Sequence, residues 1–119
     1  RMYPSREIVS SPDREQLKEV LQEISVKSSE NLSVADMAKF CGWSSSHFMR
    51  WFKKMTGDSF TSYVNDRRLA EAAEALCQTD DKILTIAQDA GFMNLSNFNR
   101  QFKKRYGVTP REYREMIGI

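Results

Sequence analysis

Hydrophobic residues recur along this chain at the spacing of amphipathic helices. In the first such stretch, Leu17, Val20, Leu21 and Ile24 lie on one face of a helix that runs to about Lys27. Six further stretches have a similar period, at about 33–41, 44–55, 60–78, 82–90, 95–106 and 110–117. No stretch shows the sustained alternation of apolar and polar residues that a half-buried strand would show. The pattern therefore predicts an all-α fold of about seven helices.

Helix-start and helix-stop residues divide these stretches. Serine, aspartate and threonine are good N-caps. The expected ones are Ser11, Ser33, Ser59, Asp80, Asp81 and Thr109, and for the third helix one of Ser44, Ser45 and Ser46. Thr109 and Glu112 fit a full capping box, with Pro110 at the first helical position. Glycine adopts positive φ freely, and the glycines expected to end helices are Gly42, Gly57, Gly91 and Gly107.

The chain contains an internal repeat. Residues 38–63 read A-x3-G-W, then F-x-R-x-F-K-K-x2-G-x-S-F-x2-Y, and residues 87–113 read A-x3-G-F, then F-x-R-x-F-K-K-x2-G-x-T-P-x2-Y. Gly42 and Gly91 are 49 positions apart, whereas Phe48 and Phe98 are 50 apart, so one extra residue lies in the turn. Such a period indicates two copies of one unit: a helix, a glycine turn and a basic helix, which together are a helix-turn-helix.

Four segments follow from this arrangement. We expect a lead-in or linker at 1–12, a first helix-turn-helix subdomain at 13–59, a connecting helix at 60–79 and a second subdomain at 80–119. A connecting helix of about 19 residues makes a rod of roughly 28 Å. With the units that it joins, this rod could hold two helices about one DNA turn apart, roughly 34 Å. A shorter separation would bend the DNA.

Basic charge is concentrated in the second helix of each copy. The net charge is only +2, but no acid lies between Ser44 and Gly57 or between Ala90 and Arg111. The cations of these two stretches are Arg50, Lys53, Lys54, Arg100, Lys103, Lys104, Arg105 and Arg111. One such run is often a solvated face, but two at equivalent places in a repeat are typical of a polyanion-binding protein.

Other features of the composition argue against membrane proteins, metalloproteins and enzymes. No apolar run approaches the ~20 residues of a membrane span, and no signal peptide is visible, so we expect a cytoplasmic, nucleoid-associated protein. Cys41 and Cys77 are too far apart for a zinc signature and are interpreted as buried free thiols. We expect no metal, no cofactor and no enzymatic activity, because the sequence offers no catalytic constellation.

The basic helices suit the major groove of duplex DNA, which accepts one helix. Since Phe48 and Phe52 face the core, residues 45, 46, 49, 50 and 53 face outward. Arg50 is the best base reader, because its guanidinium matches guanine O6 and N7. The same geometry in the second copy exposes Ser96, Asn97, Asn99, Arg100 and Lys103. Asn97 or Asn99 could pair with adenine, and Met49 could contact a thymine methyl or simply pack.

Phosphate contacts, which hold register without reading bases, are assigned to His47, Lys53, Lys54, Arg67, Lys103 and Lys104. Two of these assignments keep an alternative: His47 could have a partly buried structural role, and Arg67 could pair with Glu71. Trp43 is expected in the core. Trp51 is expected to pack on the fourth helix or to lie against the DNA backbone.

These residues resemble the DNA-binding domain of AraC/XylS-type bacterial transcription regulators, over about residues 13–117. The most specific part is the second copy: Ile86-Ala87, Gly91-Phe92, Phe98-x-Arg100-x-Phe102-Lys103-Lys104 and Gly107-x-Thr109-Pro110-x2-Tyr113. The resemblance implies seven helices and site-specific DNA binding that recruits or assists RNA polymerase, more often in activation than in repression. Its motif positions imply base reading by Ser45, Ser46, Met49, Arg50, Leu95, Ser96, Asn97, Asn99 and Arg100.

The resemblance also implies a longer parent protein. Many members of the family have an upstream domain that binds a small effector and dimerises, and this chain begins with Arg1 rather than Met. We therefore expect a fragment of an effector-responsive regulator. Ser46, Met49 and Leu95 differ from residues common at these positions in the family, so we expect the target sequence to differ.

Two other classes of function stay open from the sequence alone. A helical protein-interaction module would use the basic faces to bind an acidic partner, and it predicts weak, sequence-indifferent DNA binding. A DNA-repair enzyme would use Cys41 or Cys77 as an alkyl acceptor, although neither cysteine has a base beside it in the sequence.

Overall fold

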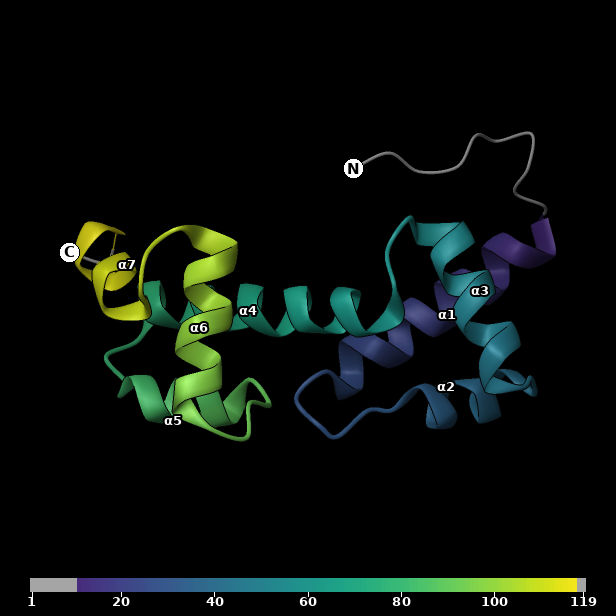
Figure 1. Cartoon of the computed structure of the whole chain (residues 1–119), viewed down its shortest axis with the longest axis horizontal. Coiled ribbons are helices and arrows are strands. Elements are labelled where there is room, and N and C mark those ends of the chain that lie inside the picture. The colour runs from purple at the N-terminus through teal and green to yellow at the C-terminus, as the bar shows by residue number, and fades with distance from the viewer. Residues whose placement is uncertain (1–10, 118–119) are drawn as a thin grey trace. The chain divides into compact units, whose positions relative to one another are not determined.

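The computed structural model describes residues 11–117, and every element in that range is a helix (Figure 1). The helices are α1 Ser11–Lys27, α2 Val34–Cys41, α3 Ser45–Thr56, α4 Phe60–Gln78, α5 Ile83–Asp89, α6 Leu95–Tyr106 and α7 Pro110–Ile117. The prediction of an all-α fold with seven helices is confirmed. The lead-in expected at 1–12 lies outside the described residues, except for its last two, which already belong to α1.

The chain divides into two compact units between Val64 and Asn65, within α4. Each unit has its own hydrophobic core. The first core consists of Val20, Ile24, Met37, Ala38, Phe48, Trp51, Phe52, Met55, Phe60 and Val64. The second consists of Leu69, Ala72, Ala73, Leu76, Ile86, Ala87, Ala90, Phe92, Phe98 and Phe102. The beginning of α4 therefore belongs to the first core, and its later turns belong to the second.

The internal repeat is visible in the aromatic contacts of the two cores. In the first unit, Phe52 and Tyr63 meet edge to face, with ring centroids 5.4 Å apart and an interplanar angle of 82°. In the second unit, Phe102 and Tyr113 meet in the same way, at 5.3 Å and 79°. Edge-to-face packing is a favourable aromatic geometry. The two copies thus share a structural contact as well as a sequence pattern.

The turn between the helices of each pair contains the one-residue difference. Gly42 follows α2 with φ 76°, and Gly91 occupies the corresponding turn after α5 with φ 102°. The second turn is longer because Met93 stands between Phe92 and Asn94, and the Met93 side chain is 94% exposed. The extra residue is thus accommodated in solvent.

Two of the predicted N-caps are wrong. Asp80 and Asp81 do not cap α5, because this helix begins at Ile83 and its N-cap is Lys82, whose side chain makes no capping hydrogen bond. The backbone N–H of Asp81 instead donates to Oγ1 of Thr79, at 3.3 Å. Because this bond closes a local turn, both aspartates lie before the helix rather than at its start.

Other predicted caps are confirmed in the first unit. The Ser33 hydroxyl accepts a hydrogen bond from the backbone N–H of Asp36 at 3.1 Å, at the start of α2. At the start of α4, the Ser59 hydroxyl accepts from the backbone N–H of Ser62 at 3.2 Å. Each cap satisfies one of the N–H groups that the first turn of a helix leaves unpaired.

Candidate nucleic-acid interface

The first candidate reading helix, α3, is held by a cap and by buried phenylalanines. The Ser44 hydroxyl accepts from the backbone N–H of His47 at 3.2 Å, and α3 ends at Gly57 with φ 84°. Phe48 and Phe52 are fully buried. The opposite face carries the predicted contact residues, all of them exposed: Ser45, Ser46, His47, Met49, Arg50, Lys53 and Lys54.

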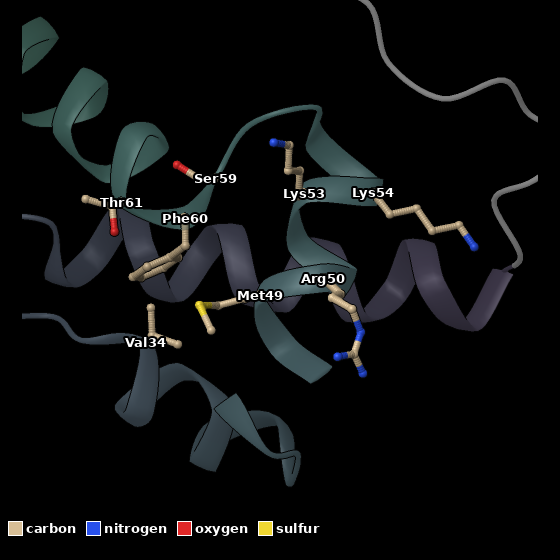
Figure 2. A pocket seen from close by; sticks show the side chains of 8 residues that line it. All are labelled: Val34, Met49, Arg50, Lys53, Lys54, Ser59, Phe60 and Thr61. Atoms are coloured by element: carbon tan, nitrogen blue, oxygen red, sulfur yellow. The ribbon is translucent and has the colours of Figure 1, made fainter. Parts of the chain in front are cut away.

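A groove of about 460 Å³ borders α3. Its lining residues are Val34, Met49, Arg50, Lys53, Lys54, Ser59, Phe60 and Thr61, none of which is acidic (Figure 2). Figure 2 shows Met49 pointing between Val34 of α2 and Phe60 of α4, while Arg50 points away from them. Met49 is still 46% exposed. The reading face of α3 therefore combines an apolar hollow with a cationic rim.

The two tryptophans of the first unit, Trp43 and Trp51, connect α3 to its neighbours. Trp51 is 8% exposed, and its indole Nε1 donates to Oδ1 of Asp13 in α1 at 3.2 Å. Its indole N–H therefore points to α1, and its ring lies in the core that also contains Phe60 and Val64 of α4. The His47 ring stacks on Trp43, with centroids 4.3 Å apart and an interplanar angle of 11°. His47 is exposed, and Trp43 is half-buried against the first core.

The second candidate reading helix, α6, repeats this design with a different cap. Oδ1 of Asn94 accepts from the backbone N–H of Asn97 at 2.7 Å, and Phe98 and Phe102 are fully buried. Asn94 was not among the predicted caps. It corresponds to Ser44 at the repeat offset of 50, and this correspondence could have identified it. The α6 face carries Ser96, Arg100, Lys103 and Lys104, which are exposed, and Asn97 and Asn99, which are half-exposed.

Two predicted contact residues have intramolecular neighbours that compete with a DNA role. Leu95 is half-buried and packs against the second core. Nε of Arg67 lies 3.5 Å from Oε2 of Glu71, four residues later in α4. The ion pair that was the alternative interpretation of Arg67 is therefore present, although half-exposed pairs of this kind hold their partners weakly.

The cysteines are free but only half-buried, so the expectation of buried thiols is wrong in degree. Nε2 of Gln16 donates to Sγ of Cys41 at 3.3 Å, and burial raises the pKa of the Cys41 thiol. A raised pKa leaves less thiolate, which is the nucleophilic form. This chemistry disfavours Cys41 as an alkyl acceptor.

Two other kinds of site are absent from residues 11–117. No group of three or more histidine, cysteine or acidic side chains in this range is placed to hold a metal ion. None of the helices in the same range is both long enough and apolar enough to cross a membrane.

Comparison with known proteins places this geometry among bacterial regulators. A helix-turn-helix domain family matches residues 37–116. The regulatory protein PocR of Salmonella typhimurium is 36% identical over 107 residues, which cover 90% of this chain but 35% of PocR. The chain thus spans about a third of the length of this curated relative.

Two solved structures have the same fold. An AraC-type transcriptional regulator of Chromobacterium violaceum superposes with a TM-score of 0.80 at 28% identity, covering 90% of this chain and 96% of that one. The DNA-binding domain of AdpA, solved in complex with a target DNA, superposes with a TM-score of 0.75 at 23% identity, covering 90% and 93%. At that identity, the second likeness concerns the fold alone.

Proposed function

Because this chain belongs to the AraC/XylS family of helix-turn-helix transcription regulators, we propose that it binds a specific duplex DNA sequence through both α3 and α6. One observation carries the proposal. Each of these helices buries its phenylalanines in a core and exposes an acid-free cationic face at the equivalent positions of a repeat. A basic face on a short, capped helix is what a major groove accepts.

Two arginines are proposed as guanine readers. Arg50 on α3 and Arg100 on α6 are both exposed and occupy equivalent positions, and a guanidinium can donate to O6 and N7 of guanine together. The remaining base-reading positions are Ser45, Ser46, Met49, Leu95, Ser96, Asn97 and Asn99. Among them, Asn97 and Asn99 are the candidates for an adenine, and Leu95 has the weakest case because it packs against the core.

The groove beside α3 gives Met49 a role in this scheme. Its apolar wall of Val34, Met49 and Phe60 lies next to the cations Arg50 and Lys53. A thymine methyl is the apolar group that a major groove presents. We assign the thymine contact of the first unit to Met49, at the mouth of this hollow.

The lysines of the two helices, together with His47 and Arg67, are proposed to contact the sugar–phosphate backbone. Lysine side chains are suited to this because a phosphate contact needs charge rather than a fixed fork. The proposed phosphate contacts are His47, Lys53, Lys54, Lys103 and Lys104, with Arg67 as a weaker candidate because of its ion pair.

The two reading helices are proposed to enter successive major grooves of one asymmetric site. They differ at their exposed positions, for example Met49 against Asn99, so each helix would recognise a different short sequence. A site of this kind has no dyad and needs only one chain. If α4 holds the units closer than one DNA turn, the DNA bends in the complex.

The parent protein is proposed to be a longer bacterial regulator that acts on chromosomal DNA in the cytoplasm. The match with 35% of the length of PocR leaves room for an upstream domain that binds an effector. We propose that it is an activator that contacts RNA polymerase, in line with the family that it belongs to.

Selection of binding sites from a random duplex library tests the proposal, at ~150 mM salt with competitor DNA because low salt inflates non-specific binding. We expect one asymmetric consensus with two boxes about one helical turn apart. A consensus with a single conserved segment would mean that only one of the two units recognises a base sequence. No enrichment at all would contradict sequence-specific binding and favour a module that binds an acidic protein.

A further inference from the structure

Three residues of the second reading helix form a chain of hydrogen bonds along one face. Oδ1 of Asn94 accepts from the backbone N–H of Asn97, at 2.7 Å. Oδ1 of Asn97 in turn accepts from Nη2 of Arg100, also at 2.7 Å. Residues three apart on a helix are neighbours on its surface, so the cap, the amide and the guanidinium lie in sequence along α6.

The bond to Arg100 changes what Asn97 can recognise. An asparagine pairs with adenine by donating to N7 and accepting from the N6 amino group, so the pair uses its side-chain oxygen. In this structure that oxygen already accepts from Arg100, so only one of its two lone pairs is left for a base. Asn99 is the half-exposed amide on the same helix that keeps its oxygen available for a base.

The same bond leaves Arg100 able to read guanine. A guanidinium has five N–H donors, and the bond to Asn97 uses one of them. The guanidinium keeps a pair of donors for O6 and N7, but its long side chain has lost rotational freedom before any DNA arrives. Interactions that are ordered in advance lose less entropy on binding.

The first unit lacks this arrangement at the equivalent positions. His47 stands where the second copy has Asn97, and its ring stacks on Trp43 at 4.3 Å. Within residues 11–117, Arg50 makes no side-chain hydrogen bond or ion pair. The two arginines at matching positions of the repeat therefore differ before DNA binds. A hydrogen bond orients the guanidinium of Arg100, and no such bond among the described residues orients that of Arg50.

From this contrast we propose that Asn97 is a positioning residue for specificity, which orients the Arg100 guanidinium toward its guanine rather than reading a base itself. The adenine contact of α6 then belongs to Asn99. The inference rests on the proposed function, since it assumes that α6 reads DNA. The proposal predicts that replacing the guanine read by Arg100 costs more affinity than replacing the guanine read by Arg50.

The test measures dissociation constants on the selected site and on its single-base variants, by fluorescence anisotropy at ~150 mM salt. Arg100→Ala first identifies the base pair that loses discrimination. Asn97→Ala should lose roughly 3- to 10-fold of the discrimination at that same base pair and little elsewhere. The double variant should be no worse there than Arg100→Ala alone, because both changes remove one coupled unit.

Two further variants separate positioning from direct reading. Asn97→Asp keeps an oxygen acceptor for Arg100, so it should retain discrimination at the Arg100 base pair while its charge weakens binding to all sequences. Asn99→Ala is the matched control, and its loss should fall at a different base pair. If Asn97→Ala loses discrimination at an adenine, or if Asn97→Asp loses as much as Asn97→Ala, the positioning role is wrong. If Arg100→Ala changes no base preference, the reading face in the proposed function is itself wrong.

Discussion

At the scale of single residues, the proposed function distinguishes cations that recognise a base from cations that contact the DNA phosphates. Arg50→Ala should cost about 1–3 kcal/mol on the selected site and relax specificity at one base pair.

Lys53→Ala should weaken binding to all duplexes about equally and reduce the salt dependence by about one unit of slope. Titrations of the selected site and a scrambled duplex over a salt series measure both effects. A Lys53→Ala loss confined to one sequence would count against the phosphate contact.

A second residue-scale prediction concerns the bond between Trp51 and Asp13. Trp51→Phe removes the indole donor and keeps most of the ring, so it should lower the free energy of unfolding by ~1 kcal/mol. DNA discrimination should stay unchanged, because Trp51 faces α1 rather than the reading face. Asp13→Asn keeps an acceptor and serves as the control in denaturant melts. Equal loss of stability in both variants would show that the charge, rather than the donor, matters.

Arg50 and Trp51 show how far the sequence alone predicts where a side chain lies. The exposure of Arg50 could be predicted because Phe48 and Phe52 lie beside it and the helical period sets which face is buried. The position of Trp51 could not, because its partner Asp13 is 38 residues earlier in the chain. Periodicity within a helix carries no information about a partner on another element.

At the scale of elements, most helix starts could be predicted from their capping residue, and the start of α7 carries a reciprocal signal as well. The backbone N–H of Thr109 donates to Oε1 of Glu112 at 2.9 Å, and the backbone N–H of Glu112 donates to the Thr109 hydroxyl at 3.1 Å. This box fixes the start of α7 as expected. Asp80 and Asp81 carry the same residue preference without a reciprocal partner, and they proved to be turn residues.

The capping box predicts a pH dependence for α7. The backbone and side-chain hydrogen bonds with Thr109 lower the pKa of Glu112 from its ordinary value of 4.5. A lowered folded-state pKa stabilises the fold above that ordinary value, and the stabilisation is lost as pH falls through the lowered pKa. Amide exchange of α7, compared between about pH 6 and about pH 3, should show this loss.

Glu112→Gln gives the control for this pH dependence, because it keeps the acceptor oxygen and removes the titration. The variant should be less protected than the wild type at the higher pH and should change less on acidification. A wild type and a Gln variant with the same acid response would mean that other carboxylates, and not Glu112, set the acid stability of α7.

At the scale of the whole molecule, the two cores share no residue among those described. Phe102→Ala should cost about 3–5 kcal/mol in the second core. Because the first core contains no atom of Phe102, amide exchange should speed up in α5, α6 and α7 well before it does in α1, α2 and α3. Phe52→Ala is the matched variant in the first unit and should give the mirror-image pattern.

A uniform loss of protection in both variants would instead show that α4 couples the two units into one cooperative transition. The sequence predicted this helix as a separate connecting segment at 60–79. In the structure, Phe60 and Val64 belong to the first core, whereas Leu69 and Leu76 belong to the second. Val64 and Leu69 are five residues apart rather than three or four, so the buried stripe changes face between them. This break in the helical spacing is the signal in the sequence that separates the two cores, and it could have placed the boundary within the connecting helix.

The matching contacts Phe52–Tyr63 and Phe102–Tyr113 bear on the ancestry of such a protein. Two units with the same aromatic joint, at 5.4 Å and 5.3 Å, are what duplication of one ancestral unit would leave behind. The contact lies on the buried side of each candidate reading helix, whereas Met49 is exposed and Asn99 is half-exposed. We therefore expect substitutions at Met49 or Asn99 to leave the contact in place. If both helices read DNA as proposed, one copy can acquire a new target sequence while the other copy still binds the old one. A change of target in two steps then needs no intermediate protein that fails to bind DNA.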